Sequence, residues 1–79
     1  DRHKPHPAPY LEAARRLGVS PLDCVAIEDS MWGLDSARAA GMKTIAVTTT
    51  YAAAQLQADR VVGGLTDVTP ALIRSILDA

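Results

Sequence analysis

The sequence has few aromatic residues and little else that could build a large core. Of its 79 residues only three are aromatic, namely Tyr10, Trp32 and Tyr51, and there is no Phe. The hydrophobic fraction is 48%, but fourteen of those residues are alanine. A chain of this length buries only about 60% of its unfolded surface. The composition therefore predicts elements that pack against a larger partner rather than a mini-protein that is stable alone.

An excess of charge of one sign and long apolar runs are also absent. Eight basic and nine acidic residues are interspersed and give a formal net charge of −1, so there is no basic stripe for nucleic acid or an anionic membrane. No apolar run approaches the ~20 residues needed to span a bilayer, and the start, DRHKPHPAPY, has no apolar signal core. We expect a soluble protein with no nucleic-acid partner and no membrane partner.

The single cysteine excludes an internal disulfide. Cys24 stands in an apolar run without a second thiol, which favours a reducing compartment and predicts a cytoplasmic protein. Its expected role is that of a small buried hydrophobe. No Gly-x-Gly-x-x-Gly, Walker-type, Gly-x-Ser-x-Gly or Cys-x-x-Cys motif occurs, so the commoner nucleotide, acyl-transfer and redox sites are not indicated.

Helices and strands alternate in the predicted secondary structure. The expected elements are a proline-stiffened lead-in at 1–9, a helix from 9 to about 17, a strand at 23–28, a helix at about 31–40, a strand at 43–47, a helical patch around 51–57, a strand at 60–62 and a helix from about 70 to 77. Tyr10, Ala14 and Leu17 should share one face of the first helix. This order predicts an α/β fold with a parallel sheet whose functional edge lies at the carboxyl ends of the strands.

The first two strands lack polar alternation, which is typical of strands covered on both faces of a parallel sheet. The helix that follows the first strand is expected to be capped by Ser30 or Asp29. Gly33, Ala37 and Ala40 fall on one side of it, so its backbone should approach the sheet closely.

Two carboxylates, Glu28 and Asp29, follow the first apolar run directly. Adjacent buried carboxylates repel each other and lose hydration, so a compensating group is needed. Mg²⁺ prefers oxygen ligands and takes one or two carboxylates together with water and substrate phosphate. The alternative is that Asp29 merely caps the helix and Glu28 points to solvent.

Other polar residues could also lie at this edge. Lys4 could present a positive charge to a phosphate, although most lysines are solvated surface residues. His3 and His6 are too few for a zinc site, and His6 is the one that could face a substrate. The hydroxyls of residues 48–50, a threonine run, could line the site or simply extend the strand.

Three stretches, HKPHPAPYLEAARRLGV, CVAIEDSMWGLDSARAAGM and KTIAVTTTY, together resemble the C-terminal half of the core domain of haloacid dehalogenase-like phosphatases. The resemblance is strong over about residues 3–51. It implies that residues 1–79 are the C-terminal segment of a single Rossmann-like core domain, without its first strands and its cap domain. The KPHP version looks like the branch that acts on sugar and sugar-alcohol phosphates, and the β-phosphoglucomutases are similar over the same stretch.

The resemblance also implies roles for individual residues. Lys4 matches the lysine that neutralises the nucleophile and the substrate phosphate, and Asp29 matches the acidic residue that helps to hold Mg²⁺. Glu28 would be a second ligand or a water-mediated partner. Ala8 departs from the family pattern because many relatives have Asp there, and the Asp-x-Asp pair with the family nucleophile does not occur in this chain.

The predicted function is therefore that of part of a Mg²⁺-dependent phosphatase, a phosphoric monoester hydrolase. Its substrates would be small phosphorylated metabolites, with sugar phosphates favoured, and the reaction would pass through an aspartyl-phosphate intermediate. The chain alone is expected to be inactive and to need the upstream half of its own domain. The alternatives are a β-phosphoglucomutase-like phosphomutase and a non-catalytic binding module of the same family. A phospho-receiver domain is disfavoured because Lys4 precedes the acidic pair.

Overall fold

The computed structural model describes residues 6–79 and confirms the predicted alternation of helices and strands. The elements are α1 (Ala8–Leu17), η1 (Pro21–Asp23), β1 (Val25–Glu28), α2 (Met31–Ala39), β2 (Lys43–Val47), η2 (Ala53–Gln55), β3 (Arg60–Val62), η3 (Leu65–Asp67) and α3 (Pro70–Leu77), where η denotes a short 3₁₀ helix. The expected patch around 51–57 is reduced to η2, and η1 and η3 were not expected. Within the described residues, no helix has the length and apolar character needed to cross a membrane.

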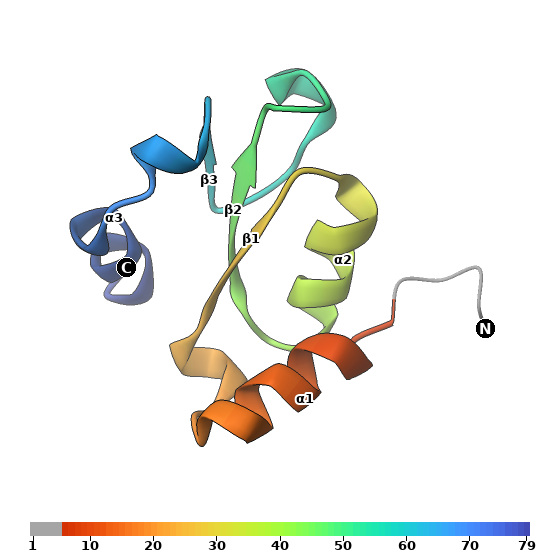
Figure 1. Cartoon of the computed structure of the whole chain (residues 1–79), viewed down its shortest axis with the longest axis vertical. Helices are drawn as coiled ribbons and strands as arrows, with labels where there is room; N and C mark the ends of the chain where they lie inside the picture. Colours follow the sequence, from red (N-terminus) through yellow and green to blue (C-terminus); the bar gives the residue numbers. More distant parts are fainter. Residues whose placement is uncertain (1–5) are drawn as a thin grey trace.

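The three strands form one parallel sheet in the order β1-β2-β3. Ile27 lies opposite Ile45, and Val47 lies opposite Val62. Helices α1 and α2 lie on one side of the sheet and α3 lies on the other (Figure 1). Because β1 is an edge strand, its outer side has no strand partner within residues 6–79. The predicted α/β architecture with a parallel sheet is confirmed.

The side of the sheet under α1 and α2 is packed with small side chains. One buried cluster consists of Ala14, Ala26, Ala37 and Met42, and a second consists of Leu34, Ala46 and Leu56. The predicted close approach of α2 is confirmed, since Ala37 and Ala40 are buried. Alanines at these positions let the helix backbone lie near the strands.

The prediction that the first strand is covered on both faces is wrong for this chain. Leu17 shares a face of α1 with Ala14, as its spacing predicts, but it is the last residue of the helix and is 75% exposed. Ile27 is 38% exposed, so β1 is not covered on both faces. The alternation of side chains along a strand puts Ile27 on the α3 side, and α3 covers β1 only in part. The strand also begins at Val25, later than expected.

The helix ends follow local capping rules. Ser30, not Asp29, caps α2, because its hydroxyl accepts the Gly33 N–H at 3.2 Å. Gly18 and Gly41 end α1 and α2 with φ angles of 71° and 89°, a conformation that glycine adopts without strain. Asp29 is therefore free of capping and stands between β1 and α2.

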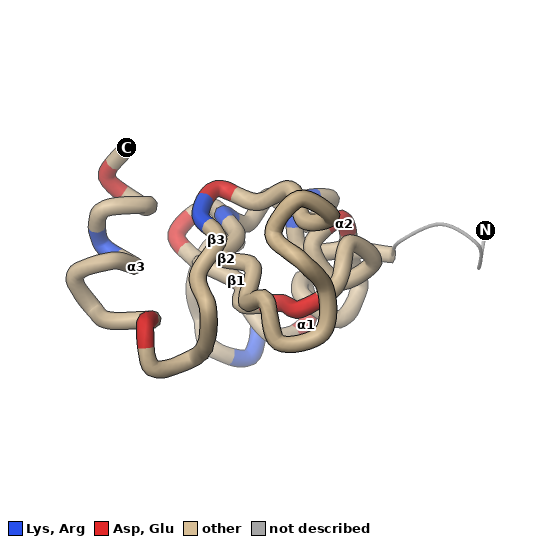
Figure 2. The backbone as a smooth tube through the Cα atoms, turned by 90° about the horizontal axis from the view of Figure 1, so that it is seen from above, with Lys and Arg blue, Asp and Glu red and all other residues tan. Residues whose placement is uncertain are grey.

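Charged residues of both signs are distributed over the described part of the chain (Figure 2). On the outer side of α1, Glu12 Oε1 lies 2.6 Å from Arg15 Nη2 and 2.9 Å from Arg16 Nε. Hydrogen bonds from these guanidinium groups hold the pKa of Glu12 below its ordinary value. Exposed pairs of this kind contribute little to stability.

Candidate active site

The carboxyl ends of β1 and β2 border a cavity of about 340 Å³. Its lining residues are Ile27, Glu28, Asp29, Val47, Thr49 and Leu65. In open parallel α/β sheets, ligands bind outside the carboxyl ends of the strands. Both members of the acidic pair thus lie where the fold places a binding site, and one threonine from the run after β2 lies beside them.

Asp29 is held by the loop that follows β2. The Thr50 hydroxyl donates a hydrogen bond to Asp29 Oδ2 at 2.7 Å. Since Ser30 caps α2, the Asp29 carboxylate is not used by the helix. The structure therefore leaves this carboxylate at the sheet edge, in contact with a hydroxyl from a second element.

Glu28 takes a different direction from its neighbour. The Tyr10 hydroxyl, from the first turn of α1, donates a hydrogen bond to Glu28 Oε2. On α2, Gly33 lies so close that a Cβ atom added there would overlap the Glu28 carboxylate. Burial, and next the Glu28 carboxylate as hydrogen-bond acceptor, raise the pKa of Tyr10 well above its ordinary value. Tyr10 therefore remains a neutral donor at physiological pH.

The remaining predicted site residues lie before or at the start of α1. His6 is exposed, and its Nδ1 accepts the Ala8 N–H at 3.2 Å. Lys4 and His3 lie outside the described residues. Cys24 is half-buried against the core cluster that contains Ala14, as expected for a small hydrophobe.

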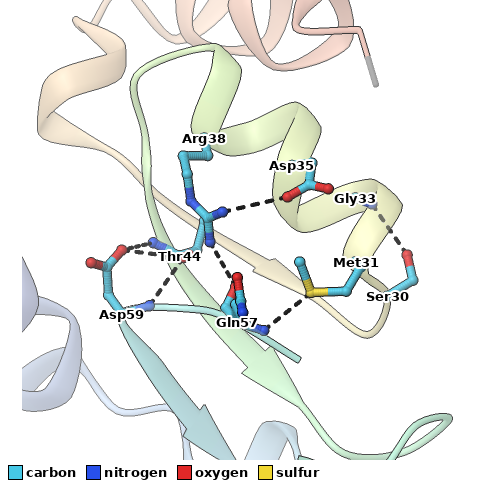
Figure 3. Close-up of polar contacts among 8 residues, drawn as sticks. All are labelled: Ser30, Met31, Gly33, Asp35, Arg38, Thr44, Gln57 and Asp59. Atoms are coloured by element: carbon cyan, nitrogen blue, oxygen red, sulfur yellow. Dashed lines mark hydrogen bonds and ion pairs between the residues drawn. The ribbon is translucent and has the colours of Figure 1, made fainter. Parts of the chain in front are cut away.

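Polar contacts that the sequence did not signal tie down the segment between β2 and β3 (Figure 3). Asp59 Oδ2 accepts hydrogen bonds from the Thr44 backbone N–H at 2.8 Å and hydroxyl at 3.1 Å, and the Asp59 N–H returns one to Thr44 Oγ1 at 3.2 Å. Arg38 donates to the Gln57 carbonyl at 2.7 Å, and the Gln57 N–H contacts Met31 Sδ at 3.1 Å. These contacts fix the end of this segment that precedes β3; Thr49 and Thr50, the threonines at the candidate site, lie at its other end.

The donor atoms at the edge suit a small hard cation. They are carboxylate and hydroxyl oxygens, the ligand type that Mg²⁺ selects. Within residues 6–79, no three side chains of His, Cys, Asp or Glu come together as a complete metal cage. Mg²⁺ is usually held by only one or two carboxylates together with water and substrate phosphate, so Asp29 and Glu28 fit part of such a site.

The amino-terminal half of the chain matches a family model. A model described as "haloacid dehalogenase-like hydrolase" covers residues 1–41. Hexitol phosphatase B of Escherichia coli strain K12 is 54% identical over 44 residues, which are 56% of this chain and 20% of that protein. The bifunctional riboflavin kinase/FMN phosphatase of Arabidopsis thaliana is 45% identical over 67 residues, or 82% of this chain and 18% of that protein.

The fold also matches solved structures. The crystal structure of β-phosphoglucomutase from Clostridium difficile superposes with a TM-score of 0.83 at 30% sequence identity, over 95% of this chain and 33% of that one. The chain thus spans a fifth or less of the two curated relatives and a third of this structure. Most of the chain is matched, but most of each longer protein lies outside the match.

Proposed function

The chain belongs to the haloacid dehalogenase-like hydrolases, and on this premise we propose that it is the C-terminal segment of the core domain of a Mg²⁺-dependent phosphatase. The substrates are small phosphorylated metabolites, with sugar phosphates as the favoured class. The observation that carries the proposal is the acidic pair, Glu28 and Asp29, which borders a cavity at the carboxyl edge of a parallel sheet. The relative named hexitol phosphatase B supports the substrate class.

Four residues of this chain have a defined part in the proposed reaction. Asp29 and Glu28 provide oxygen atoms for the cation, Lys4 offsets the negative charge of the phosphoryl oxygens, and His6 contacts the substrate. When bound, Mg²⁺ stabilises the charge that develops on the phosphoryl group. The nucleophile is an aspartate in the upstream half of the domain, which attacks phosphorus as the bond from phosphorus to the ester oxygen breaks and the alcohol leaves with a proton. Water then hydrolyses the aspartyl-phosphate intermediate, which frees the aspartate and releases inorganic phosphate.

The proposal is tested in the full-length protein with p-nitrophenyl phosphate and with sugar phosphates as substrates. We expect Asp29→Asn to weaken the response of turnover to Mg²⁺ and Lys4→Ala to lower kcat, each more than tenfold, because one preorganised electrostatic group is often worth about 3 kcal/mol. Cys24→Ala is the control and should leave turnover nearly unchanged. If Cys24→Ala abolished turnover in a folded protein while Asp29→Asn did not, the assignment of the site would be wrong.

A phosphomutase is the second candidate, because the β-phosphoglucomutase structure matches most of the chain. A mutase must keep its phosphorylated aspartate from water long enough to pass the phosphate to another sugar hydroxyl. Product analysis with β-glucose 1-phosphate separates the two activities: a phosphatase releases inorganic phosphate, whereas a mutase yields glucose 6-phosphate. A full-length sequence without an Asp-x-Asp pair upstream would instead favour a non-catalytic binding module.

A further inference from the structure

The contact between Tyr10 and Glu28 joins two elements that are far apart in sequence. Tyr10 is in the first turn of α1 and Glu28 is the last residue of β1. The Tyr10 ring is half-buried against the cluster that contains Ala14, Ala26 and Ala37. This packing limits the movement of the ring and so of its hydroxyl. Within residues 6–79, Tyr10 is the one side chain that hydrogen-bonds to this carboxylate.

The opposite side of the Glu28 carboxylate is limited by α2. Gly33 leaves room for the carboxylate that any side chain at position 33 would fill. The Gly33 N–H is already used by the Ser30 hydroxyl, so the glycine supplies space and no hydrogen bond. A glutamate at the end of a strand would otherwise sample several rotamers, and fixing it beforehand removes an entropic cost from ligand binding.

We propose that Tyr10 is a positioning residue for Glu28, and that the Tyr10 hydroxyl and the space at Gly33 together hold the Glu28 carboxylate in the orientation that serves the cation at the sheet edge. This inference rests on the proposed function of the acidic pair. Tyr10 does not touch the substrate; it acts through Glu28. Precise sites depend on such supporting contacts, because a first ligand that is held loosely binds poorly.

The test uses the full-length protein and measures Mg²⁺ binding directly by titration calorimetry, beside turnover. Tyr10→Phe keeps the packed ring and removes only the hydroxyl. We expect the dissociation constant for Mg²⁺ to rise about threefold to tenfold, the range that corresponds to the net contribution of one ordinary hydrogen bond. Tyr51→Phe is the matched control, because Tyr51 is 45% exposed and its hydroxyl has no hydrogen-bond partner within residues 6–79; its Mg²⁺ affinity should equal that of the wild type.

Two further variants separate positioning from packing. In a Glu28→Gln background, Tyr10→Phe should have no added effect on Mg²⁺ affinity, because the group it positions is gone. Gly33→Ala, which pushes the carboxylate from the other side, should also weaken Mg²⁺ binding. If Tyr10→Phe lowered the melting temperature but left Mg²⁺ affinity unchanged, or if its effect added fully to that of Glu28→Gln, Tyr10 would be a packing residue only. A wild-type protein that neither binds Mg²⁺ nor turns over a phosphate ester would overturn the proposed function itself.

Discussion

The two sides of the sheet differ in how completely this chain covers them. Under α1 and α2, the side chains of Leu34, Ala37 and Ala46 are fully buried. On the α3 side, Ile27 remains 38% exposed, and Leu65 near the strand ends is 65% exposed. The first side is a finished core built from close-packed small residues, whereas the second still presents apolar surface to solvent.

The sheet edge next to the candidate site is also open. The outer edge of β1 has no strand partner in the described chain, and such an edge is a template for pairing with another strand. The acidic pair lies at the carboxyl end of this same strand. The exposed apolar surface on the α3 side and the open edge of β1 both lie next to the candidate site. We propose that the upstream half of the domain covers them.

The largest expected effect concerns activity. The isolated 79-residue chain should show no turnover of p-nitrophenyl phosphate in the presence of Mg²⁺, because no Asp-x-Asp pair occurs in it, while the full-length protein should be active. We also expect the isolated chain to self-associate or to be partly unfolded, and amide exchange at β1 to slow only when the upstream half is present.

Two results would contradict this prediction. One is turnover by the pure 79-residue chain at a rate comparable to that of the full-length protein. The other is a monomer in sedimentation experiments with strongly protected amides in both β1 and β2. The first result would mean that the chain does not need an upstream nucleophile, and the second that the open side of the sheet needs no further covering.

The second expected effect is on the free energy of unfolding. It compares one residue from the α1 and α2 side of the sheet with one from the α3 side. In the full-length protein, Leu34→Ala should lower the free energy of unfolding by about 2–5 kcal/mol, because it leaves a cavity in the finished core. Ile27→Ala should cost a comparable amount there, since we expect the upstream half to cover it. Denaturant unfolding with both variants measures the two costs.

The control for this pair is Leu22→Ala. Leu22 is 73% exposed, and exposed substitutions usually change stability by within about 0.5 kcal/mol. An Ile27→Ala variant as mild as Leu22→Ala would show that the α3 side stays open in the full-length protein, and the proposed covering would then be wrong.

Much of the fold could be predicted from local patterns. The apolar runs before Glu28 and after Met42 give the first two strands, and the glycines at 18 and 41 give the ends of two helices. What failed was the expected cover of β1 on both faces, since Ile27 is 38% exposed, because the amount of cover depends on which segments are present to pack against the strand. A sequence pattern shows which residues favour burial but not whether this chain provides the partner.

The candidate site was predictable only in part. The adjacent carboxylates at a strand end pointed to the sheet edge, and the structure places both beside one cavity. The hydroxyls that hold them, from Tyr10 and Thr50, are 18 and 21 residues away in sequence, so no local spacing connects them. Gly33 was expected to allow close approach to the sheet, but nothing in the sequence showed that the neighbour would be a carboxylate.

The smallest expected effect concerns the hydrogen bonds between Thr44 and Asp59, on the side of the sheet that α1 and α2 cover. Thr44 is 1% exposed, and its hydroxyl both donates to the Asp59 carboxylate and accepts the Asp59 N–H. Thr44→Val keeps the shape of the side chain and removes both hydrogen bonds, which leaves the Asp59 N–H unpaired. We expect a loss of about 1–3 kcal/mol in the free energy of unfolding, measured by denaturant titration of the full-length protein.

Thr66→Val is the matched control, because Thr66 is exposed in η3 and within residues 6–79 its side chain makes no hydrogen bond; this change should fall within about 0.5 kcal/mol. Turnover at saturating Mg²⁺ adds a second measurement. Because Asp59 fixes the far end of the segment that carries Thr49 and Thr50, Thr44→Val should lower turnover only modestly, and by less than Asp29→Asn does. A Thr44→Val protein as stable as the Thr66→Val protein would mean that the covered side is held by apolar packing alone and that the Asp59 contacts add nothing to it.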